Sequence, residues 1–381
     1  MLTSTEKYFI SLLRSVLTDS KAEVPADLNE FELVAVAQRQ QLFGTIASAI
    51  EKQEGVSDIM KRSARQARYE AIALDMRLLA ELQAIEEAME QAEIPLMPLK
   101  GAVTKGLYPY SYFRTMSDLD ILYHKEDEAR IIEVMQKRGY TAESKKEEDN
   151  HLIFKKQPMI HVEYHTRLIH DGRKYDFLDD DWAHTHLKEG RSYIYEMSSE
   201  RHYEHHLLHL LQHFLDGGVG ARFIMDIYMY RNANVPIDRA RLQADCEKMG
   251  IWKFAKNAEH LAEVWFGNEK ATELDEKLGQ FIIEGGLYGT PAHRETTYLS
   301  KAGGSKARYY LRAVFEPKER IKGNYPVLQK APFLLPFCYV HRILKRLLTR
   351  RRAFKTRLKA SISIDSEQAA RQRELFEEIG V

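Results

Sequence analysis

Hydrophobic residues change their spacing twice along this chain, which divides it into three zones. Up to about residue 92 they recur every three to four positions, the period of amphipathic helices, and the last of these segments covers residues 57–92. From about 94 to 168 the pattern becomes strand, helix, strand. Helical spacing returns from about 175 onward and predicts helices over 200–215, 221–231, 237–249, 251–266 and 272–284.

These zones predict an α+β fold in which a strand-containing module lies between two helical regions. We divide the chain into an N-terminal helical region (1–93), the module (94–170), a C-terminal helical domain (171–310) and a basic amphipathic C-terminal segment (311–381). A chain of 381 residues, of which 44% are hydrophobic, is long enough for two or three domains with a sizeable core.

The module begins with a pattern that is typical of phosphate binding. An apolar run over 94–99 predicts a short strand, which ends in a Lys100-Gly101 turn and leads into a helix that starts near Ala102. A helix N-terminus presents backbone N–H groups that bind phosphate, and glycine allows a close approach of the backbone. We therefore expect Lys100, Gly101 and Ala102 to contact phosphate groups, with Lys100 adding a positive charge.

Two aspartates follow in the next predicted strand. Because side chains alternate between the faces of a strand, Asp118 and Asp120 point the same way, while Leu119 and Ile121 face the core. Neighbouring carboxylates repel each other and raise each other's pKa unless a cation lies between them, and Mg²⁺ prefers such oxygen ligands. The alternative is a turn in which Asp118 caps the backbone and Asp120 is solvated.

The remainder of the module is predicted to be one helix and two strands. The helix covers 125–137 and ends at Gly139, and the strands cover 151–156 and 159–168. In the second of these strands, alternation places Glu163, His165 and Arg167 on one face and Val162, Tyr164 and Thr166 on the other.

The order of these motifs resembles the minimal nucleotidyltransferases of the DNA polymerase β superfamily, in particular the group of uncharacterised nucleotidyltransferases. The resemblance is carried by a Leu-Lys-Gly turn, an Arg shortly before Asp-x-Asp, and an acidic-x-His strand. The matching residues are Leu99-Lys100-Gly101, Arg114, Asp118-Leu119-Asp120 and Glu163-Tyr164-His165. The superfamily usually has Gly-Ser or Gly-Gly at the turn and a shorter spacer before the first Asp, whereas this chain has Gly101-Ala102 and a longer spacer.

The resemblance implies a mixed sheet with flanking helices and a metal-dependent nucleotidyltransferase. Asp118, Asp120 and Glu163 would be the catalytic, metal-binding residues, with Mg²⁺ or Mn²⁺ as the ion and a nucleoside triphosphate such as ATP as substrate. Lys100, Gly101, Ala102, Arg114 and His165 would bind the nucleotide. The reaction would move a nucleoside monophosphate to a hydroxyl acceptor and release pyrophosphate. For Arg114 the alternative is a surface position in an aromatic loop, and for His165 a hydrogen bond to a neighbouring carboxylate.

Histidines gather on the helix predicted over 200–215. Several pairs are spaced by four residues, which is a spacing that can chelate a transition metal, yet no cysteine and no His-Glu-x-x-His motif accompanies them. We expect His209 or His213 to face a cleft between the module and the helical domain. Arg222, at the start of the next helix, would meet phosphate or pair with Asp226.

Charge and cysteine content limit the classes of partner. Lys+Arg and Asp+Glu both total 56, so no global field favours long nucleic acids. Two cysteines, Cys246 and Cys338, give neither a disulfide framework nor a zinc spacing, which fits a reducing, cytoplasmic location. We find no pattern typical of an export signal or a membrane span.

The basic stretch 341–359 is the local exception to this neutral balance. It mixes Lys and Arg with Ile, Leu and Phe, and the part over 345–359 could contact an anionic membrane surface, nucleic acid or an acidic partner. The alternative is a solvated helix that covers the fold.

Two further functions remain open at this point. One is a catalytically inactive nucleotide- or partner-binding protein of the same fold, for which the altered Gly101-Ala102 turn is the main support. The other is a histidine-rich helical metalloprotein in which the two aspartates are only structural.

Overall fold

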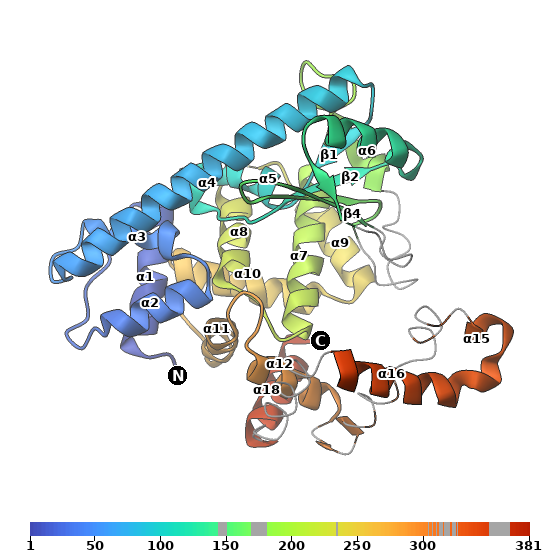
Figure 1. Cartoon of the computed structure of the whole chain (residues 1–381). Helices are drawn as coiled ribbons and strands as arrows, with labels where there is room; N and C mark the ends of the chain where they lie inside the picture. Colours follow the sequence, from blue (N-terminus) through green and yellow to red (C-terminus); the bar gives the residue numbers. More distant parts are fainter. Residues whose placement is uncertain are drawn as a thin grey trace.

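The computed structural model describes residues 1–143, 151–168, 181–233, 235–303, 327–349 and 366–381, together with several residues between 305 and 325. Within this part, a five-stranded mixed sheet is surrounded by helices (Figure 1). The α+β fold class and the mixed sheet with flanking helices are therefore confirmed.

The sheet has the strand order β1-β2-β5-β4-β3. Its strands are β1 (Leu96–Pro98), β2 (Leu119–Tyr123), β3 (Thr141–Ala142), β4 (His151–Lys156) and β5 (Ile160–His165). β2 and β5 are parallel, whereas the pairs β1/β2, β5/β4 and β4/β3 are antiparallel. The register between the parallel strands sets Asp120 opposite Glu163.

One face of the sheet is covered by two helices, α4 (Asp58–Gln91) and α6 (Glu128–Lys137). Ser57 caps α4 by accepting a hydrogen bond from the amide of Met60, and Gly139 follows α6 with a positive φ of 82°. The core between helices and sheet is made by Leu78, Leu82, Ile85 and Met89 of α4, Ile131 and Met135 of α6, and Ile121, Tyr123, Val162 and Tyr164 of the strands. The predicted alternation is thus confirmed over residues 162–165, since Glu163 and His165 lie on the opposite face from this core, whereas Thr166 and Arg167 follow the end of β5.

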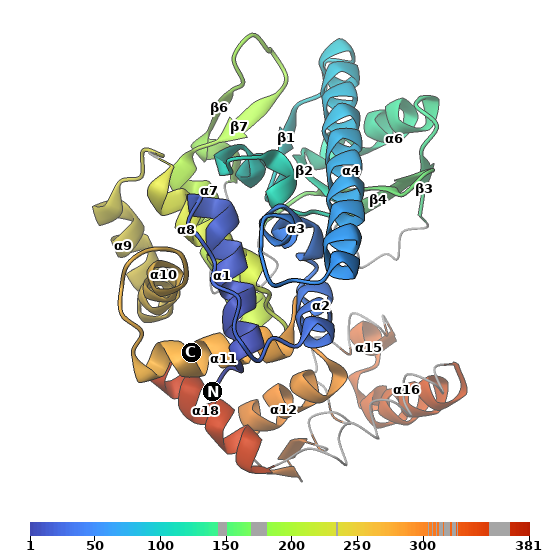
Figure 2. The ribbon, with the colours of Figure 1, turned by 90° about the vertical axis from the view of Figure 1, so that its left-hand side faces the viewer.

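The helices at the two ends of the chain share a second core. α1 (Ser4–Thr18), α2 (Glu30–Arg39) and α3 (Phe43–Glu51) pack with α7 (Ser199–Leu215), α8 (Ala221–Asn232), α9 (Arg239–Met249), α10 (Trp252–Phe266) and α11 (Glu273–Gly285). α18 (Ser366–Ile379) joins them through Leu375 and Phe376. Figure 2 shows α1 in front of α7 and α8, with both chain termini marked near α11 in the lower half of the view.

The helices predicted by spacing are confirmed with small shifts at their ends, whereas short elements differ more. The helix expected near Ala102 is a single turn, α5 (Gly101–Thr104), followed by η1 (Lys105–Leu107), because the chain must turn back toward the sheet. Asp118 lies in a bend just before β2 rather than inside the strand. The hairpin of β6 (Thr185–Leu187) and β7 (Tyr195–Met197) was not predicted, because its strands are only three residues long.

The remaining described helices are α12 (Pro291–Lys301), α15 (Val327–Lys330) and α16 (Leu335–Thr349). The domain boundaries at 93, 170 and 310 stay predictions. The basic stretch 341–359 is described only as far as residue 349, and the onset of the C-terminal helices near 175 lies outside the described residues. No helix among the described residues is long and apolar enough to cross a membrane.

A close approach of two loops should make Gly218 sensitive to substitution. A Cβ atom at Gly218 would lie 2.2 Å from the backbone of both Tyr288 and Gly289, and Tyr288 lines the pocket described below. We expect Gly218→Ala to lower the free energy of unfolding in urea by at least about 2 kcal/mol, because backbone atoms must move.

Gly106→Ala is the matched control, since a Cβ at Gly106 would meet no atom within 4 Å. Its free energy of unfolding should stay within about 1 kcal/mol of the wild-type value. Equal losses for the two variants would show that the loop contact does not constrain Gly218.

Candidate active site

A pocket of about 180 Å³ lies between the open face of the sheet and helix α7. Its walls come from the turn after β1, the loop before β2, strands β2 and β5, helices α7 and α8, and the segment after α11. Of the residues singled out from the sequence, the pocket is lined by Lys100, Gly101, Arg114, Asp118, Asp120, Glu163, His209, His213 and Arg222.

Three carboxylates meet on the sheet side of this pocket. One group of potential metal ligands is Asp118, His161 and Glu163, and another is Asp120, Glu163 and His165. Within each group the ligand atoms lie within 4.8 Å of one another. Glu163 belongs to both groups. Carboxylate oxygens are the ligands that Mg²⁺ and Mn²⁺ prefer, so the three carboxylates of this cluster fit a hard divalent ion.

Asp120 is held in its ionised form by two donors. Its Oδ1 lies 2.6 Å from Nζ of Lys100 and 2.7 Å from Nε2 of His165. Burial raises the pKa of Asp120, but the hydrogen bond from His165 and the charge of Lys100 outweigh burial, so its pKa lies well below the usual range.

Asp118 has the opposite perturbation. Burial, followed by the charges of Asp120 and Glu163, raises its pKa, and the opposing effects of Lys100 and Arg222 do not cancel this. Neighbouring carboxylates were expected to raise each other's pKa unless a cation lies beside them. Asp118 shows this rise, and Asp120 shows the exception, because its carboxylate has a lysine and a histidine as direct partners. A cation beside Asp118 would relieve this repulsion.

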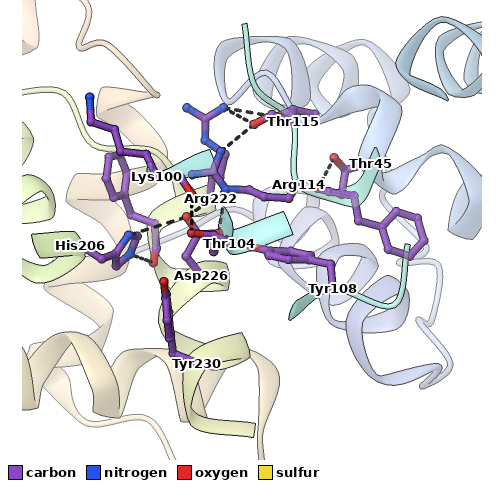
Figure 3. A network of polar contacts seen from close by, with 12 residues as sticks. Thr45, Lys100, Thr104, Tyr108, Arg114, Thr115, His206, Arg222, Asp226 and Tyr230 are labelled. Atoms are coloured by element: carbon purple, nitrogen blue, oxygen red, sulfur yellow. Dashed lines mark hydrogen bonds and ion pairs between the residues drawn. The ribbon is translucent and has the colours of Figure 1, made fainter. Parts of the chain in front are cut away.

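Arg114 is positioned by a buried aspartate, Asp226, a pairing that was not predicted from the sequence. Nε of Arg114 donates to Oδ1 and Oδ2 of Asp226 at 2.8 and 3.0 Å, and its Nη1 donates to the carbonyl of Thr115 at 2.8 Å. The hydroxyl of Tyr108 also donates to Asp226, at 2.5 Å (Figure 3). Asp226 has no exposed surface, so this network fixes the guanidinium at the edge of the pocket.

Arg222 lies beside Arg114. Of the two roles expected for Arg222, the pairing with Asp226 does not form, because Arg114 binds that carboxylate. Nη1 of Arg222 donates to the carbonyl of Thr115 at 2.7 Å (Figure 3). Burial and the neighbouring charge of Arg114 lower the pKa of Arg222 to about 10, which leaves it cationic at neutral pH. Within the described residues Arg222 has no carboxylate partner within 4 Å, so its charge is available to an anion in the pocket.

The turn that carries Lys100 differs from the predicted phosphate-binding helix end. Lys100 has a positive φ of 49°, and a Cβ at Gly101 would lie 3.1 Å from Nη1 of Arg114, so glycine gives that guanidinium room. The amide of Ala102 donates to the carbonyl of Leu99 at 3.2 Å, and Ala102 does not line the pocket among the described residues. The expectation that this amide is unpaired is therefore wrong, because the helix is one turn long and closes on the strand before it.

The histidines of α7 form the wall opposite the carboxylates. His202, His205 and His206 line the pocket beside the predicted His209 and His213. Nε2 of His209 lies 3.0 Å from Nε2 of His213. Burial and then the charge of Lys100 lower the pKa of His205, His209 and His213, so these rings are neutral at neutral pH. Neither group of potential metal ligands found in the described residues includes a histidine of α7.

The sequence also matches a family model over this whole arrangement. Residues 27–267 match the model of the uncharacterised nucleotidyltransferase family. The chain belongs to this family. The match extends beyond the motifs of the module and includes both α4 and the helices α7 to α10, so the resemblance noted from the sequence is confirmed. No curated protein and no solved structure matches the chain.

Membership of the uncharacterised nucleotidyltransferase family supports nucleotidyl transfer as the general activity, and hence a transferase with a nucleotide substrate. The acidic cluster could bind a metal ion. Lys100, Asp118, Asp120 and Glu163 could be predicted from short motifs in the sequence. By contrast, Asp226 lies 112 residues from Arg114, and no spacing rule could have linked them.

The buried pair of Arg114 and Asp226 should be essential for stability. We expect Asp226→Asn to lower the free energy of unfolding by about 3–5 kcal/mol, because it leaves a buried guanidinium without its counter-ion. Urea unfolding monitored by circular dichroism measures this loss. Asp58→Asn, at an exposed position in the first turn of α4, is the control and should cost less than about 1 kcal/mol. A loss as small as that of the control would contradict the role of Asp226.

The raised pKa of Asp118 gives a pH dependence with a defined sign. The folded-state pKa of Asp118 exceeds its unfolded-state pKa, so the ionised carboxylate destabilises the fold above the folded-state pKa. This cost falls as the pH drops below the folded-state pKa and is gone below the unfolded-state pKa. In buffer with a chelator, Asp118→Asn should therefore be at least as stable as wild type at neutral pH. The wild type should gain on the variant as the solution is acidified.

Denaturant titrations at several pH values test this, again with Asp58→Asn as the control for replacing an aspartate. A wild type that loses stability relative to Asp118→Asn on acidification would show that the carboxylate is stabilised, not destabilised, by its surroundings.

Proposed function

We propose that this protein is a metal-dependent nucleotidyltransferase that transfers a nucleoside monophosphate from a nucleoside triphosphate to a hydroxyl acceptor and releases pyrophosphate. The observation that supports this most directly is the arrangement of charge in one pocket. Asp118, Asp120 and Glu163 lie on its sheet side, and the cations Lys100, Arg114 and Arg222 lie around them. A triphosphate is anionic and its divalent ion is cationic. The cationic side chains of this pocket complement the triphosphate, and its carboxylates complement the ion.

The carboxylates of Asp118, Asp120 and Glu163 would hold Mg²⁺ or Mn²⁺. When bound, such ions neutralise charge on the attacking and leaving oxygens of a phosphoryl transfer. Ionised Asp120 needs no proton loss before it can bind a cation. His165 donates to Asp120 and thereby orients that carboxylate, which is the role we propose for it in place of direct nucleotide contact.

The cations would bind the phosphate chain. Arg114, fixed by Asp226, and Arg222, fixed by Thr115, present guanidinium groups that can each bind phosphate oxygens in a bidentate manner. Lys100 lies close enough to Asp120 to reach phosphate oxygens bound beside the carboxylates. These groups stabilise the charge that builds on pyrophosphate as the bond between the α-phosphorus and its bridging oxygen breaks.

The acceptor hydroxyl would lie beside Glu163. Its oxygen forms the new bond to the α-phosphorus, and its proton passes to the carboxylate of Glu163. The neutral histidines of α7, which face this carboxylate across the pocket, can donate and accept hydrogen bonds to position the acceptor without adding charge.

A catalytically inactive nucleotide-binding protein of the same fold is the second candidate. The ion pair of Lys100 with Asp120 favours it, because a lysine then neutralises a carboxylate that a metal would otherwise neutralise. The histidine-rich metalloprotein is not proposed, because no α7 histidine joins a potential ligand group within the described residues.

The proposed reaction can be tested with each of the four nucleoside triphosphates labelled at the α-phosphorus. We expect label transfer to a component of a cell extract and release of pyrophosphate, both dependent on Mg²⁺ or Mn²⁺. The double variant Asp118→Asn/Asp120→Asn should lose at least about a hundredfold in rate. Asp58→Asn should retain the wild-type rate.

A parallel measurement of Mn²⁺ and nucleotide binding distinguishes the two candidates. Binding of both without turnover would support the inactive binding protein. Absence of both binding and turnover would contradict a nucleotide site, and the aspartates would then be structural.

A further inference from the structure

Helix α16 carries an apolar face that points away from the rest of the protein. Phe337, Val340 and Leu344 are 70%, 57% and 53% exposed, and Phe333 in the preceding turn η6 (Pro332–Leu334) is 77% exposed. Their spacing of four, three and four residues places them along one side of the helix. α16 lies at the edge of the molecule, remote from the sheet, in both Figure 1 and Figure 2.

The other side of α16 is already packed. Cys338 is 6% exposed and belongs to a small core with Ile321 and Leu328. The hydroxyl of Tyr325 and Nδ1 of His341 are 2.9 Å apart and connect the helix to the segment before it. These contacts fix the rotation of α16 about its own axis, and this orientation leaves the apolar face exposed to solvent.

This face differs from the other exposed hydrophobic residues of the protein. Phe31, Ile59 and Met76 are also strongly exposed, but they occur singly on separate turns, as is normal for a protein surface. On α16, by contrast, four large apolar side chains follow one another over three turns. Such a continuous patch indicates a surface that is covered by a partner.

The charge of the sequence that contains α16 indicates what that partner is. Residues 320–364 contain twelve Lys and Arg and no Asp or Glu, in a chain whose charges balance as a whole. A basic segment of this length favours an extended anionic surface, while aromatic and aliphatic side chains at helical spacing favour an apolar layer. A nucleic acid offers an anionic surface but no apolar layer for the exposed face of α16. An anionic lipid surface offers an anionic surface and an apolar layer together.

We propose that α16 docks in the plane of an anionic membrane surface, with Phe333, Phe337, Val340 and Leu344 at the boundary between headgroups and acyl chains. Lys345 is exposed next to Leu344, and the sequence continues with seven further Lys and Arg up to residue 359, a charge that favours anionic headgroups. The helix is fifteen residues long, which suits a helix that lies on a bilayer and not one that crosses it. This inference does not depend on the proposed chemistry, because no residue of α16 is among the described residues that line the pocket.

The test uses the full chain and two kinds of vesicle, phosphatidylcholine alone and phosphatidylcholine mixed with phosphatidylglycerol. We expect the protein to sediment with the anionic vesicles, with little sedimentation on the neutral ones, and binding should weaken as salt is raised. The triple variant Phe337→Ser/Val340→Ser/Leu344→Ser should lower the partition coefficient at least about tenfold. Phe31→Ser, which removes a 91% exposed phenylalanine from α2, should leave it unchanged.

A second variant gives a readout that does not require loss of binding. Phe337→Trp keeps the position apolar, and its added fluorescence should shift to shorter wavelength with anionic vesicles, whereas Phe31→Trp should show no shift. No sedimentation with anionic vesicles, equal binding to both kinds of vesicle, or full binding by the triple variant would each overturn the proposal. The proposal would also be overturned if the protein bound RNA or an acidic protein but no vesicles, and if the triple variant kept that binding.

Discussion

The parallel pairing of β2 with β5 is the constraint on which the candidate site depends. It places Asp120 directly opposite Glu163 and, on the other face, buries the neighbouring residues against α4 and α6. Because side chains alternate along a strand, a shift of one residue in this register would bring Glu163 into the core and Tyr164 into the pocket. The hydrophobic core therefore fixes the position of the acids, even though it contains none of them.

Gathering these acids has an energetic cost that the surrounding residues offset only in part. Lys100 and His165 compensate Asp120, whereas the raised pKa of Asp118 shows that its charge is poorly compensated. A protein selected for stability alone would have no reason to keep a third carboxylate beside two others. Uncompensated charge in a pocket is instead typical of sites in which a ligand or a transition state completes the electrostatics.

The sequence predicted those parts of the fold and site that depend on local pattern. Long helices such as α4 and α10 have enough turns for their periodicity to be clear, and the alternation in β5 correctly separated Glu163 and His165 from Val162 and Tyr164. Contacts between distant segments gave no such signal. The pairing of Arg114 with Asp226, the shared core of the terminal helices and the single turn of α5 all depend on which surfaces meet after folding.

The pocket combines neutral histidines on α7 with charged side chains beside the sheet, and this difference in charge decides what the pocket can bind. The α7 histidines come from the helical core and the carboxylates from the sheet, so the pocket exists only while the two are packed together. Burial lowers the pKa of all five α7 histidines in the pocket, so their rings are neutral at neutral pH. The positive charge among the described residues of the pocket is then carried by Lys100, Arg114 and Arg222. Five additional imidazolium charges would have made the pocket attract any anion. With neutral rings, strong attraction is restricted to the place where two guanidinium groups and one ammonium group lie beside three carboxylates. This arrangement supports the proposed ligand, a nucleotide that carries phosphate and a divalent cation together.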